Sequence, residues 1–391
     1  MSVQSSGWTK RFDFLSLSVW MIVSLGLAVV SFLYFGVDFR GYYAAARVLL
    51  AGGNPYDYHQ VAPVLLNVTG SMGNNPYYYP PWFAWLFVPV AFLPFQIARG
   101  VWMAFNLAIW NLSLWKLSGI LHWQQKGWRL YSLFLLSTLT FGWITLRYEQ
   151  ASILVFAIFV LTILSIQNEQ WDRTGIWMAL LLIKPNITLI AVAVLCLWFV
   201  RRRQWRPVLV MMAALIILFV AATLITPDWF DPFFASGFWQ GLTSALDGPD
   251  QVVAARINTT VFDWLAIFGV EGLLRGAIYG LLAITGFVIL AWTVYRVESP
   301  LELIGISLLV SFALTPYALQ YDYAPLVLVL FWALSLCVSS PISRRVGLLL
   351  AMFVFSVSVW QQNIAWGFWI VVGLAALAIW GSAQIYRSQR N

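Results

Sequence analysis

Four short motifs hold the charged and polar residues of this sequence that could do chemistry in or beside a membrane. The first contains Asp38, which closely follows a run of 22 uncharged residues from Phe14 to Phe35, and Arg40. Two functions fit this carboxylate. It either caps the next helix by accepting hydrogen bonds from free backbone amides, or acts as a general base that takes a proton from a hydroxyl group at the membrane surface.

The second motif is Lys184-Pro185-Asn186. Lys184 is the only charged residue between Gly175 and Val200. Because proline lacks a backbone donor, Pro185 breaks a helix at this point. The lysine either extends its ammonium group to the membrane surface or binds an anion, and its place in the middle of the segment favours phosphate binding. Asn186 is a candidate for the same donor site.

Two further polar breaks interrupt apolar segments. Glu149 and Gln150 follow Arg147 at one break, where Arg147 and Glu149 either pair with each other or contact a substrate, with Gln150 as a donor-binding candidate. Tyr321 and Asp322 lie at the other break, which is either a short exposed loop or part of a substrate site. Ionisable residues at such depths are costly and therefore mark candidate functional sites.

A polar stretch at 37–80, the first outer loop, separates the first apolar run from the next. Arg40–Ala51 and Tyr58–Val68 are expected to be short helices on the outer surface. Asp57 lies in the turn between them and either caps the second helix or contacts a substrate. The loop is rich in tyrosine, which favours the membrane–water boundary; we regard Tyr42, Tyr43 and Tyr79 as substrate-site candidates.

Composition restricts the class of protein. Hydrophobic residues make up 61% of the 391 residues and charged residues only 9%, too few to cover a soluble protein. The apolar runs are continuous rather than alternating, which argues against a β-barrel. The sequence therefore predicts an all-α polytopic membrane protein, one domain over 1–391, with about 10–13 transmembrane helices.

Twelve apolar segments are candidate spans: Phe14–Phe35, Pro81–Phe95, Ile97–Leu117, Leu130–Leu146, Ala151–Ile166, Gly175–Val200, Pro207–Ile225, Leu273–Tyr295, Leu303–Pro316, Ala324–Val338, Gly347–Trp360 and Trp366–Tyr386. Several are shorter than the roughly 18 residues that a span needs on its own. The first is longer than a secretory signal core, so it is read as a retained span.

Basic residues at the ends of the apolar runs suggest the orientation. Twelve full crossings would put three of them outside, against the positive-inside rule: Lys116, Lys126 and Arg129. In the alternative, Gly175–Val200 is a broken hairpin and Pro81–Leu117 crosses once. Both topologies stay open, and both place the termini in the cytoplasm. The first outer loop and a second at 227–258 then face the outer side of the cytoplasmic membrane.

Other sequence features exclude several functions. The net charge of +7 comes from basic residues at span ends rather than on one face, so no nucleic-acid partner is expected. Cys196 and Cys337 lie inside apolar runs, which argues against a disulfide framework. His59 and His122 have no cysteine partners at ligand spacing, which argues against a zinc site. This leaves a divalent metal held by carboxylates open, and no metal site or cofactor is assigned. No nucleotide-binding motif is present, which points to a lipid-linked donor.

The motifs together resemble glycosyltransferase family 87, of the GT-C superfamily. The resemblance rests on four stretches in the family's order: Asp38-Phe39 through Gly52-Gly53-Asn54-Pro55-Tyr56-Asp57, then Tyr79-Pro80-Pro81, Lys184-Pro185-Asn186, and Thr315-Pro316-Tyr317 with Tyr321-Asp322-Tyr323. Two departures bear on substrate choice. The family usually has Gly-Gln where this chain has Glu149-Gln150, and many relatives have histidine where it has Tyr321-Asp322.

The resemblance implies a GT-C-like bundle and an inverting transfer of a sugar, often mannose, from a polyprenyl-phosphate donor to a lipid or glycan acceptor. It maps the family's catalytic aspartate onto Asp38, while Arg40 and Lys184 would stabilise the leaving phosphate. A lipid or solute transporter without glycosyl transfer is the alternative. It explains the many spans equally well, but explains less well an aromatic-rich outer loop with an acid at the exit of the first span.

Overall fold

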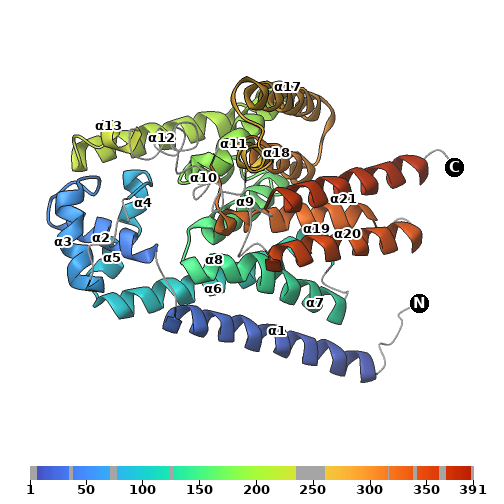
Figure 1. The fold of residues 1–391 in the computed structure, drawn as a ribbon, viewed down its shortest axis with the longest axis horizontal. Helices are drawn as coiled ribbons and strands as arrows, with labels where there is room; N and C mark the ends of the chain where they lie inside the picture. The colour runs from blue at the N-terminus through green and yellow to red at the C-terminus, as the bar shows by residue number, and fades with distance from the viewer. Residues whose placement is uncertain are drawn as a thin grey trace.

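The computed structural model describes residues 7–34, 38–70, 77–123, 127–234, 260–315, 317–337, 341–360 and 367–388. Helices make up the fold and no β-strand occurs in these ranges, which confirms the all-α prediction (Figure 1). The helices are α1 (Gly7–Tyr34), α2 (Phe39–Leu50), α3 (Tyr58–Thr69), α4 (Pro81–Trp85), α5 (Val88–Ala91), α6 (Phe95–Ile120), α7 (Trp128–Ser137), α8 (Trp143–Tyr148), α9 (Ser152–Gln167), α10 (Trp171–Leu181), α11 (Pro185–Arg201), α12 (Arg206–Ile225), α13 (Phe230–Phe233), α16 (Val261–Ile267), α17 (Gly272–Arg296), α18 (Pro300–Leu314), α19 (Leu326–Leu336), α20 (Pro341–Trp360) and α21 (Gly367–Ser388).

Among the described residues, four helical segments are long and apolar enough to cross a bilayer unaided: Arg11–Leu33, Trp128–Tyr148, Arg206–Ile225 and Gly272–Arg296. Several other apolar helices are shorter, including Ser152–Gln167, Pro185–Arg201, Pro300–Leu314 and Leu326–Leu336. A short helix is tolerated at membrane depth where neighbouring protein covers its ends. The many predicted spans thus divide into full-length helices and shorter ones that stop inside the protein.

The helix breaks agree with the second of the two topologies, whereas the number of membrane crossings stays a prediction. The apolar segment 175–200 is divided between α10, which ends at Leu181, and α11, which begins at Pro185. Proline suits the first position of a helix, where its missing amide costs nothing. After Pro81 come two short helices, and then α6 runs for 26 residues without a break. Lys184 therefore lies at the tip of a hairpin.

The first outer loop contains the two predicted helices, α2 and α3, with bounds within one residue of those expected. They lie at the opposite end of the bundle from the start of α1 and the end of α21 (Figure 1). Gly52 has a φ of 74°, a left-handed conformation that favours glycine and ends α2 where predicted. Of the second outer loop, Asp228 and Asp231 are described, whereas 235–259, with Asp247, Asp250 and Arg256, lies outside the described residues.

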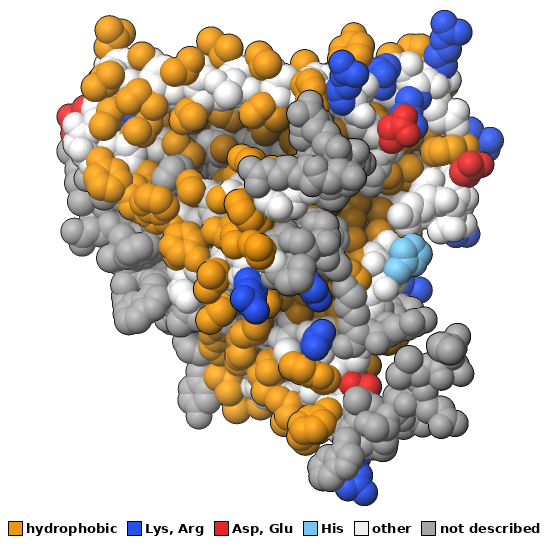
Figure 2. Space-filling model, turned by 90° about the vertical axis from the view of Figure 1, so that its right-hand side faces the viewer, with side chains coloured by type: hydrophobic (Ala, Val, Ile, Leu, Met, Phe, Trp, Pro, Cys, Tyr) orange, Lys and Arg blue, Asp and Glu red, His pale blue; other side chains and the backbone are white. Residues whose placement is uncertain are grey.

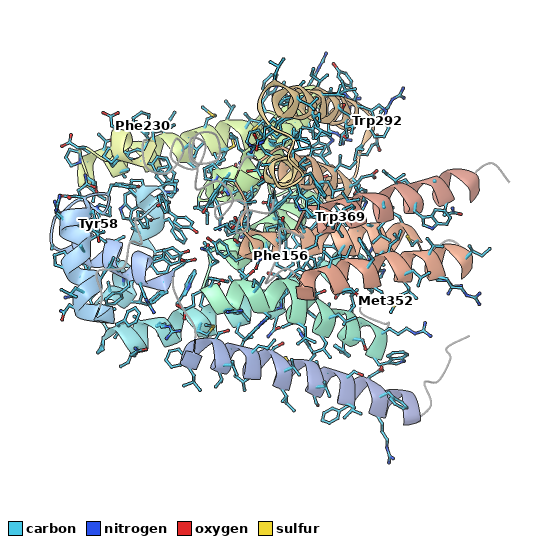
Figure 3. The ribbon with its side chains drawn as sticks, viewed as in Figure 1. Tyr58, Phe156, Phe230, Trp292, Met352 and Trp369 are labelled. Atoms are coloured by element: carbon cyan, nitrogen blue, oxygen red, sulfur yellow. The ribbon has the colours of Figure 1, made fainter. Side chains whose placement is uncertain are left out.

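The outer surface of the bundle is apolar where a bilayer would contact it. Trp292 of α17 is 56% exposed and Met352 of α20 is 62% exposed, whereas Phe156 of α9 is fully buried in the centre (Figure 3). The end face where α1 begins displays several Lys and Arg side chains (Figure 2). An apolar belt with basic residues at one end is the arrangement of an integral membrane protein, which this chain is.

A π-helical turn, Thr138–Gly142, joins α7 to α8. The Thr138 hydroxyl accepts hydrogen bonds from the indoles of Trp20 on α1, at 3.2 Å, and Trp110 on α6, at 2.9 Å. Gly142 packs against Trp110 so closely that a Cβ atom would lie 2.8 Å from the indole ring. These contacts fix the start of α8 against α1 and α6.

Candidate active site

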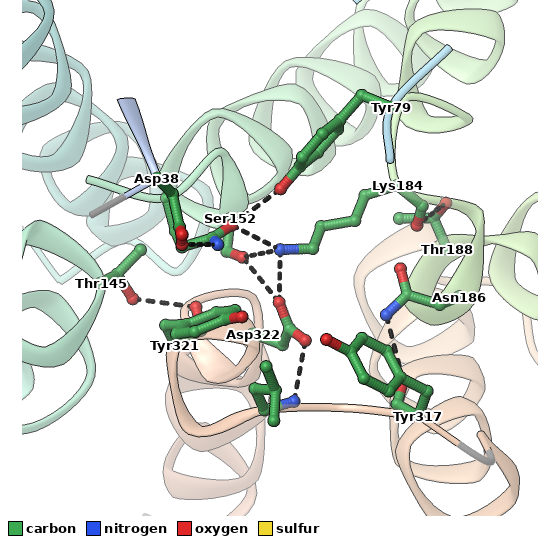
Figure 4. Close-up of polar contacts among 12 residues, drawn as sticks. Asp38, Tyr79, Thr145, Ser152, Lys184, Asn186, Thr188, Tyr317, Tyr321 and Asp322 are labelled. Carbon is green, nitrogen blue, oxygen red and sulfur yellow. Dashed lines mark hydrogen bonds and ion pairs between the residues drawn. The ribbon is translucent and has the colours of Figure 1, made fainter. Parts of the chain in front are cut away.

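The broken helices converge on a buried cluster of polar side chains, the polar cluster: Asp38, Tyr79, Gln150, Ser152, Lys184 and Asp322 (Figure 4). Asp38 precedes α2, Gln150 and Ser152 lie at the break between α8 and α9, and Lys184 lies at the break between α10 and α11. Asp322 belongs to the turn between α18 and α19. Every break that the sequence marks with a polar residue therefore contributes to one site.

Gln150 connects the proposed base to the lysine. Its Nε2 amide donates a hydrogen bond to the Asp38 carboxylate, while its Oε1 accepts one from Lys184 Nζ at 2.9 Å. Tyr79 also donates to Oε1, at 2.8 Å. These partners fix the orientation of the amide, because the flipped form would set its NH₂ group against the ammonium group of Lys184. The Gln150 side chain thus holds Asp38 and Lys184 at a defined separation.

Lys184 is buried and its ammonium group contacts three acceptors. They are Gln150, the Ser152 hydroxyl at 2.9 Å, and the Asp322 carboxylate, with which it forms an ion pair. The tyrosine rings of Tyr79 and Tyr321 lie 5.8 and 5.3 Å from Nζ, within cation–π range. The ammonium therefore does not reach the membrane surface, and the interpretation of Lys184 as a snorkelling residue is wrong.

Asp322 is fully buried, and its carboxylate contacts a hydroxyl group, a backbone amide and the ammonium group of Lys184. The Ser152 hydroxyl donates to Oδ1 at 3.1 Å, and the Leu319 amide donates to Oδ2 at 2.9 Å. A buried carboxylate persists only with such partners and an opposite charge. The exposed-loop interpretation of this segment is therefore wrong, and Asp322 fixes the position of Lys184.

Asp38 is half-buried, and its side chain makes no capping hydrogen bond with α2. The helix-cap interpretation is therefore wrong for this residue. Burial raises the pKa of the Asp38 carboxyl to about 6, while the hydrogen bond from Gln150 and the charges of Lys184 and Arg40 act in the opposite direction. A carboxylate with a pKa of about 6 is mostly ionised at neutral pH and more basic than an ordinary aspartate, which suits a proton acceptor.

Two tyrosines of the first outer loop complete this side of the cluster. Tyr42 donates to Tyr79 at 3.1 Å and reaches Gln150 Oε1 at 3.4 Å, and the two rings meet edge to face at 5.2 Å. Burial raises the pKa of both phenols well above the usual value, so both stay protonated as hydrogen-bond donors. Both hydroxyls therefore contact the Gln150 oxygen.

The remaining predicted residues lie at varying distances from the cluster. Arg40 is half-buried and influences Asp38 through its charge. Asn186 donates a hydrogen bond to the Tyr317 carbonyl at 3.1 Å, which connects the start of α11 to the segment between α18 and α19. Tyr43 instead donates to the Leu93 carbonyl at 2.9 Å, and Asp57 caps α3 by accepting from the His59 amide at 2.9 Å. The structure does not bring Tyr43 or Asp57 to the cluster.

Sequence reasoning missed Ser152, a member of the cluster, and Arg99, which lies beside it. Ser152 is an ordinary small residue on an apolar helix, and nothing in the sequence distinguishes it. Arg99 is a charge near the start of a candidate span, so the scarcity of charge that singled out Lys184 could have found it. It pairs with Glu149, Nε to Oε1 at 2.5 Å, so the pairing of Glu149 with Arg147, which the sequence left open, is wrong.

Neither Cys196 nor Cys337 forms a disulfide bond. Within the described ranges no three His, Cys, Asp or Glu side chains gather as a group that could hold a metal ion. The fixed cations near Asp38 are instead Lys184 and Arg40, which act on it through their charges.

A family model described as Glycosyltransferase family 87 matches residues 77–319, more than half of the chain. The chain belongs to glycosyltransferase family 87. This family 87 glycosyltransferase is also similar to a solved structure, ArnT from Cupriavidus metallidurans bound to undecaprenyl phosphate, at 16% identity and a TM-score of 0.46; the alignment covers 98% of this chain and 78% of that one. A comparison with curated protein sequences gave no match.

The family match includes part of the polar cluster. Tyr79, Gln150 and Lys184 lie within the matched residues, whereas Asp38 precedes them and Asp322 follows them. The place of the two aspartates in the site of this glycosyltransferase therefore rests on the geometry, through their contacts with Gln150, Ser152 and Lys184.

Proposed function

We propose that this glycosyltransferase moves a sugar, a hexose such as mannose, from a polyprenyl-phosphate donor to a hydroxyl group of a lipid or glycan acceptor, with inversion at the anomeric carbon. Asp38 is the general base. Family membership supports sugar transfer over the transporter alternative, and the apolar surface of the bundle suits a donor that arrives within the bilayer. The observation that carries the proposal is the hydrogen bond from Gln150 to Asp38 in a cluster that also holds Lys184.

The proposed reaction needs one base and a site for a leaving phosphate. The acceptor hydroxyl gives its proton to Asp38 as its oxygen forms a bond to the anomeric carbon. The bond from that carbon to the phosphate oxygen breaks on the opposite face, and the polyprenyl phosphate leaves with the electron pair. Positive charge develops on the sugar and negative charge on the phosphate. Arg40 and Lys184 supply fixed positive charge for the latter.

Lys184 binds the phosphate only if one of its present contacts gives way. Its ammonium group has three donors, and Gln150, Ser152 and Asp322 accept them. Of these partners the neutral Ser152 hydroxyl is the easiest to replace with a phosphate oxygen, because the exchange adds an anion and keeps the ion pair with Asp322. Donor binding therefore reorganises the cluster without separating Lys184 from Asp322.

The proposal places the site on the outer side of the cytoplasmic membrane. Asp38 lies at the start of α2, at the end of the bundle opposite to that where α1 begins (Figure 1). The end face at the start of α1 displays Lys and Arg side chains, which favours a cytoplasmic location for it under the positive-inside rule (Figure 2). A lipid-linked donor is the sugar source available on the other side.

Purified protein incubated with a polyprenyl-phosphate hexose and candidate acceptors tests the proposal. We expect a glycosylated acceptor whose new linkage is inverted relative to the donor, as read by NMR. Asp38→Asn abolishes the product. Asp57→Asn is the matched control, because it alters a carboxylate of the same loop that caps α3, and it leaves product formation unchanged. A retained anomeric configuration, or flux of an unmodified lipid with no product, would contradict the proposal.

A further inference from the structure

A second buried ion pair lies next to the polar cluster without belonging to it. Arg99 of α6 and Glu149, at the turn after α8, are 8% and 2% exposed, and Arg99 Nε lies 2.5 Å from Glu149 Oε1. The other carboxylate oxygen of Glu149 is buried and has no hydrogen-bond partner among the described residues. A buried ion pair whose carboxylate has one oxygen without a hydrogen bond contributes little to the stability of a fold. The free-energy cost of burying these charges therefore points to a role other than stability.

Arg99 connects this turn to two long helices. Its guanidinium donates to the Ser31 carbonyl of α1 at 3.1 Å, and lies 5.0 Å from the ring of Phe32. One helical turn later on α6, the Trp102 indole donates to the backbone carbonyl of Glu149 at 2.9 Å. Glu149 is thus held to α6 through its side chain and its backbone, and to the end of α1 through Arg99.

The two residues on either side of Glu149, Tyr148 and Gln150, both contact Asp38. The Asp38 amide donates to the Tyr148 carbonyl at 3.4 Å, and Gln150 donates to the Asp38 carboxylate. Glu149 itself has a φ of 58°, a left-handed conformation that glycine adopts more readily. A glutamate at this position works against the backbone preference, and what it gains is the contact with Arg99.

We propose that Arg99 and Glu149 are positioning residues for the proposed base. By fixing the 148–150 turn against α6 and the end of α1, they hold the Gln150 amide in hydrogen-bond contact with Asp38. The inference rests on the proposed function of Asp38. It assigns to Arg99 and Glu149 no contact with substrate, so their loss alters catalysis through the geometry of Asp38 rather than through binding of the donor.

The test removes both charges together, because removing one alone leaves the other buried and unpaired. Arg99→Met with Glu149→Gly does this, and glycine suits the left-handed backbone. We expect a folded protein with a kcat lower by about tenfold, because small displacements of reacting groups cost one to two orders of magnitude. The donor KM stays unchanged. The acid limb of the pH profile moves upward, because Asp38 loses the Gln150 hydrogen bond that lowers its pKa.

Two further variants complete the design. Arg99→Lys keeps the charge but cannot reach Glu149 and Ser31 together, so it shows the same shifts in kcat and acid limb even where the double variant fails to fold. Asp172→Asn with Arg206→Gln removes an exposed ion pair of the same chemistry, at 2.7 Å, and is the matched control with wild-type kinetics.

Folding is checked by size-exclusion chromatography and thermal unfolding in detergent. A folded double variant or Arg99→Lys variant with wild-type kcat would overturn the inference, as would a lowered kcat with an unmoved acid limb. Asp38→Asn, assayed in parallel, separates the two proposals. Turnover in Asp38→Asn refutes the proposed base, whereas wild-type kinetics in the double variant refute only the positioning role.

Discussion

Replacing Gln150 with methionine removes the hydrogen bond that connects Asp38 to Lys184 and keeps the length of the side chain. The Gln150 amide favours the ionised form of Asp38, so its loss raises the pKa of that carboxyl above about 6. A hydrogen bond to a charged group is worth about 1.5–3 kcal/mol when fully buried. Asp38 is half-buried, so we take the lower value, which is about one pKa unit.

The sign and size of the effect follow from the ionised fraction. A base acts only when ionised, so activity falls as the pH drops through the pKa of Asp38. For a shift from about 6 to about 7, the ionised fraction falls about twofold at pH 7 and about fivefold at pH 6. The loss of alignment adds a further decrease that does not depend on pH.

The assay is kcat/KM for sugar transfer measured from pH 5 to pH 9. We expect the acid limb of Gln150→Met about one unit above that of the wild type. Gln60→Met is the control, since Gln60 donates its amide to the exposed carboxylate of Asp57 at 2.9 Å, away from the cluster. An acid limb that stays in place in Gln150→Met would show that Asp38 is not the titrating base.

Three other predictions concern the cluster and its orientation. Lys184→Met leaves Asp322 buried without its partner and lowers the free energy of unfolding by about 3–5 kcal/mol. The double variant Lys184→Met with Asp322→Asn recovers most of this stability but does not recover donor binding. Equal melting temperatures of the two variants would contradict this prediction. Disruption of the exposed Arg206–Asp172 pair leaves the melting temperature unchanged in the same assay. A cysteine introduced at Tyr58 reacts with a membrane-impermeant thiol reagent in intact cells, and one at His122 reacts only after permeabilisation; the reverse pattern would invert the proposed orientation.

Much of the site could be predicted because charge is scarce in this chain. In an apolar segment a residue such as Lys184 needs a partner, and a proline beside it marks a helix end. The two features together indicated a break with a functional side chain. Polar residues in apolar surroundings also mark the break at Arg147, Glu149 and Gln150 and the proline-marked break at Asp322. Three of the breaks that form the cluster could therefore be predicted, although not that they meet.

The contacts between these breaks could not be predicted. Lys184 and Asp322 are far apart in the sequence, and no local pattern pairs them; the ion pair follows from the packing of α11 against α18. For Glu149, the sequence left open a pairing with its neighbour Arg147. The side chain instead pairs with Arg99, which lies 50 residues earlier in the sequence, and Glu149 itself has a left-handed conformation.

The sequence alone does not decide between the two membrane topologies, for a related reason. Hydropathy measures the length of an apolar segment, but does not show whether the chain continues through the membrane or turns back at its middle. Pro185 fits a kink within a span and a hairpin tip equally well. The observed arrangement, with α10 ending at Leu181 and α11 starting at Pro185, also removes the conflict with Arg129, since Pro81–Leu117 then contains one long helix, α6.

The central claim is that Asp38 takes the proton of the acceptor. Its most direct test is Asp38→Asn, measured for donor binding and for transfer in the same preparation. We expect the donor Kd to stay within a small factor of the wild-type value and the rate of transfer to fall by at least about 10²-fold, the usual contribution of a general base. Transfer at the wild-type rate by a folded Asp38→Asn protein would contradict the claim.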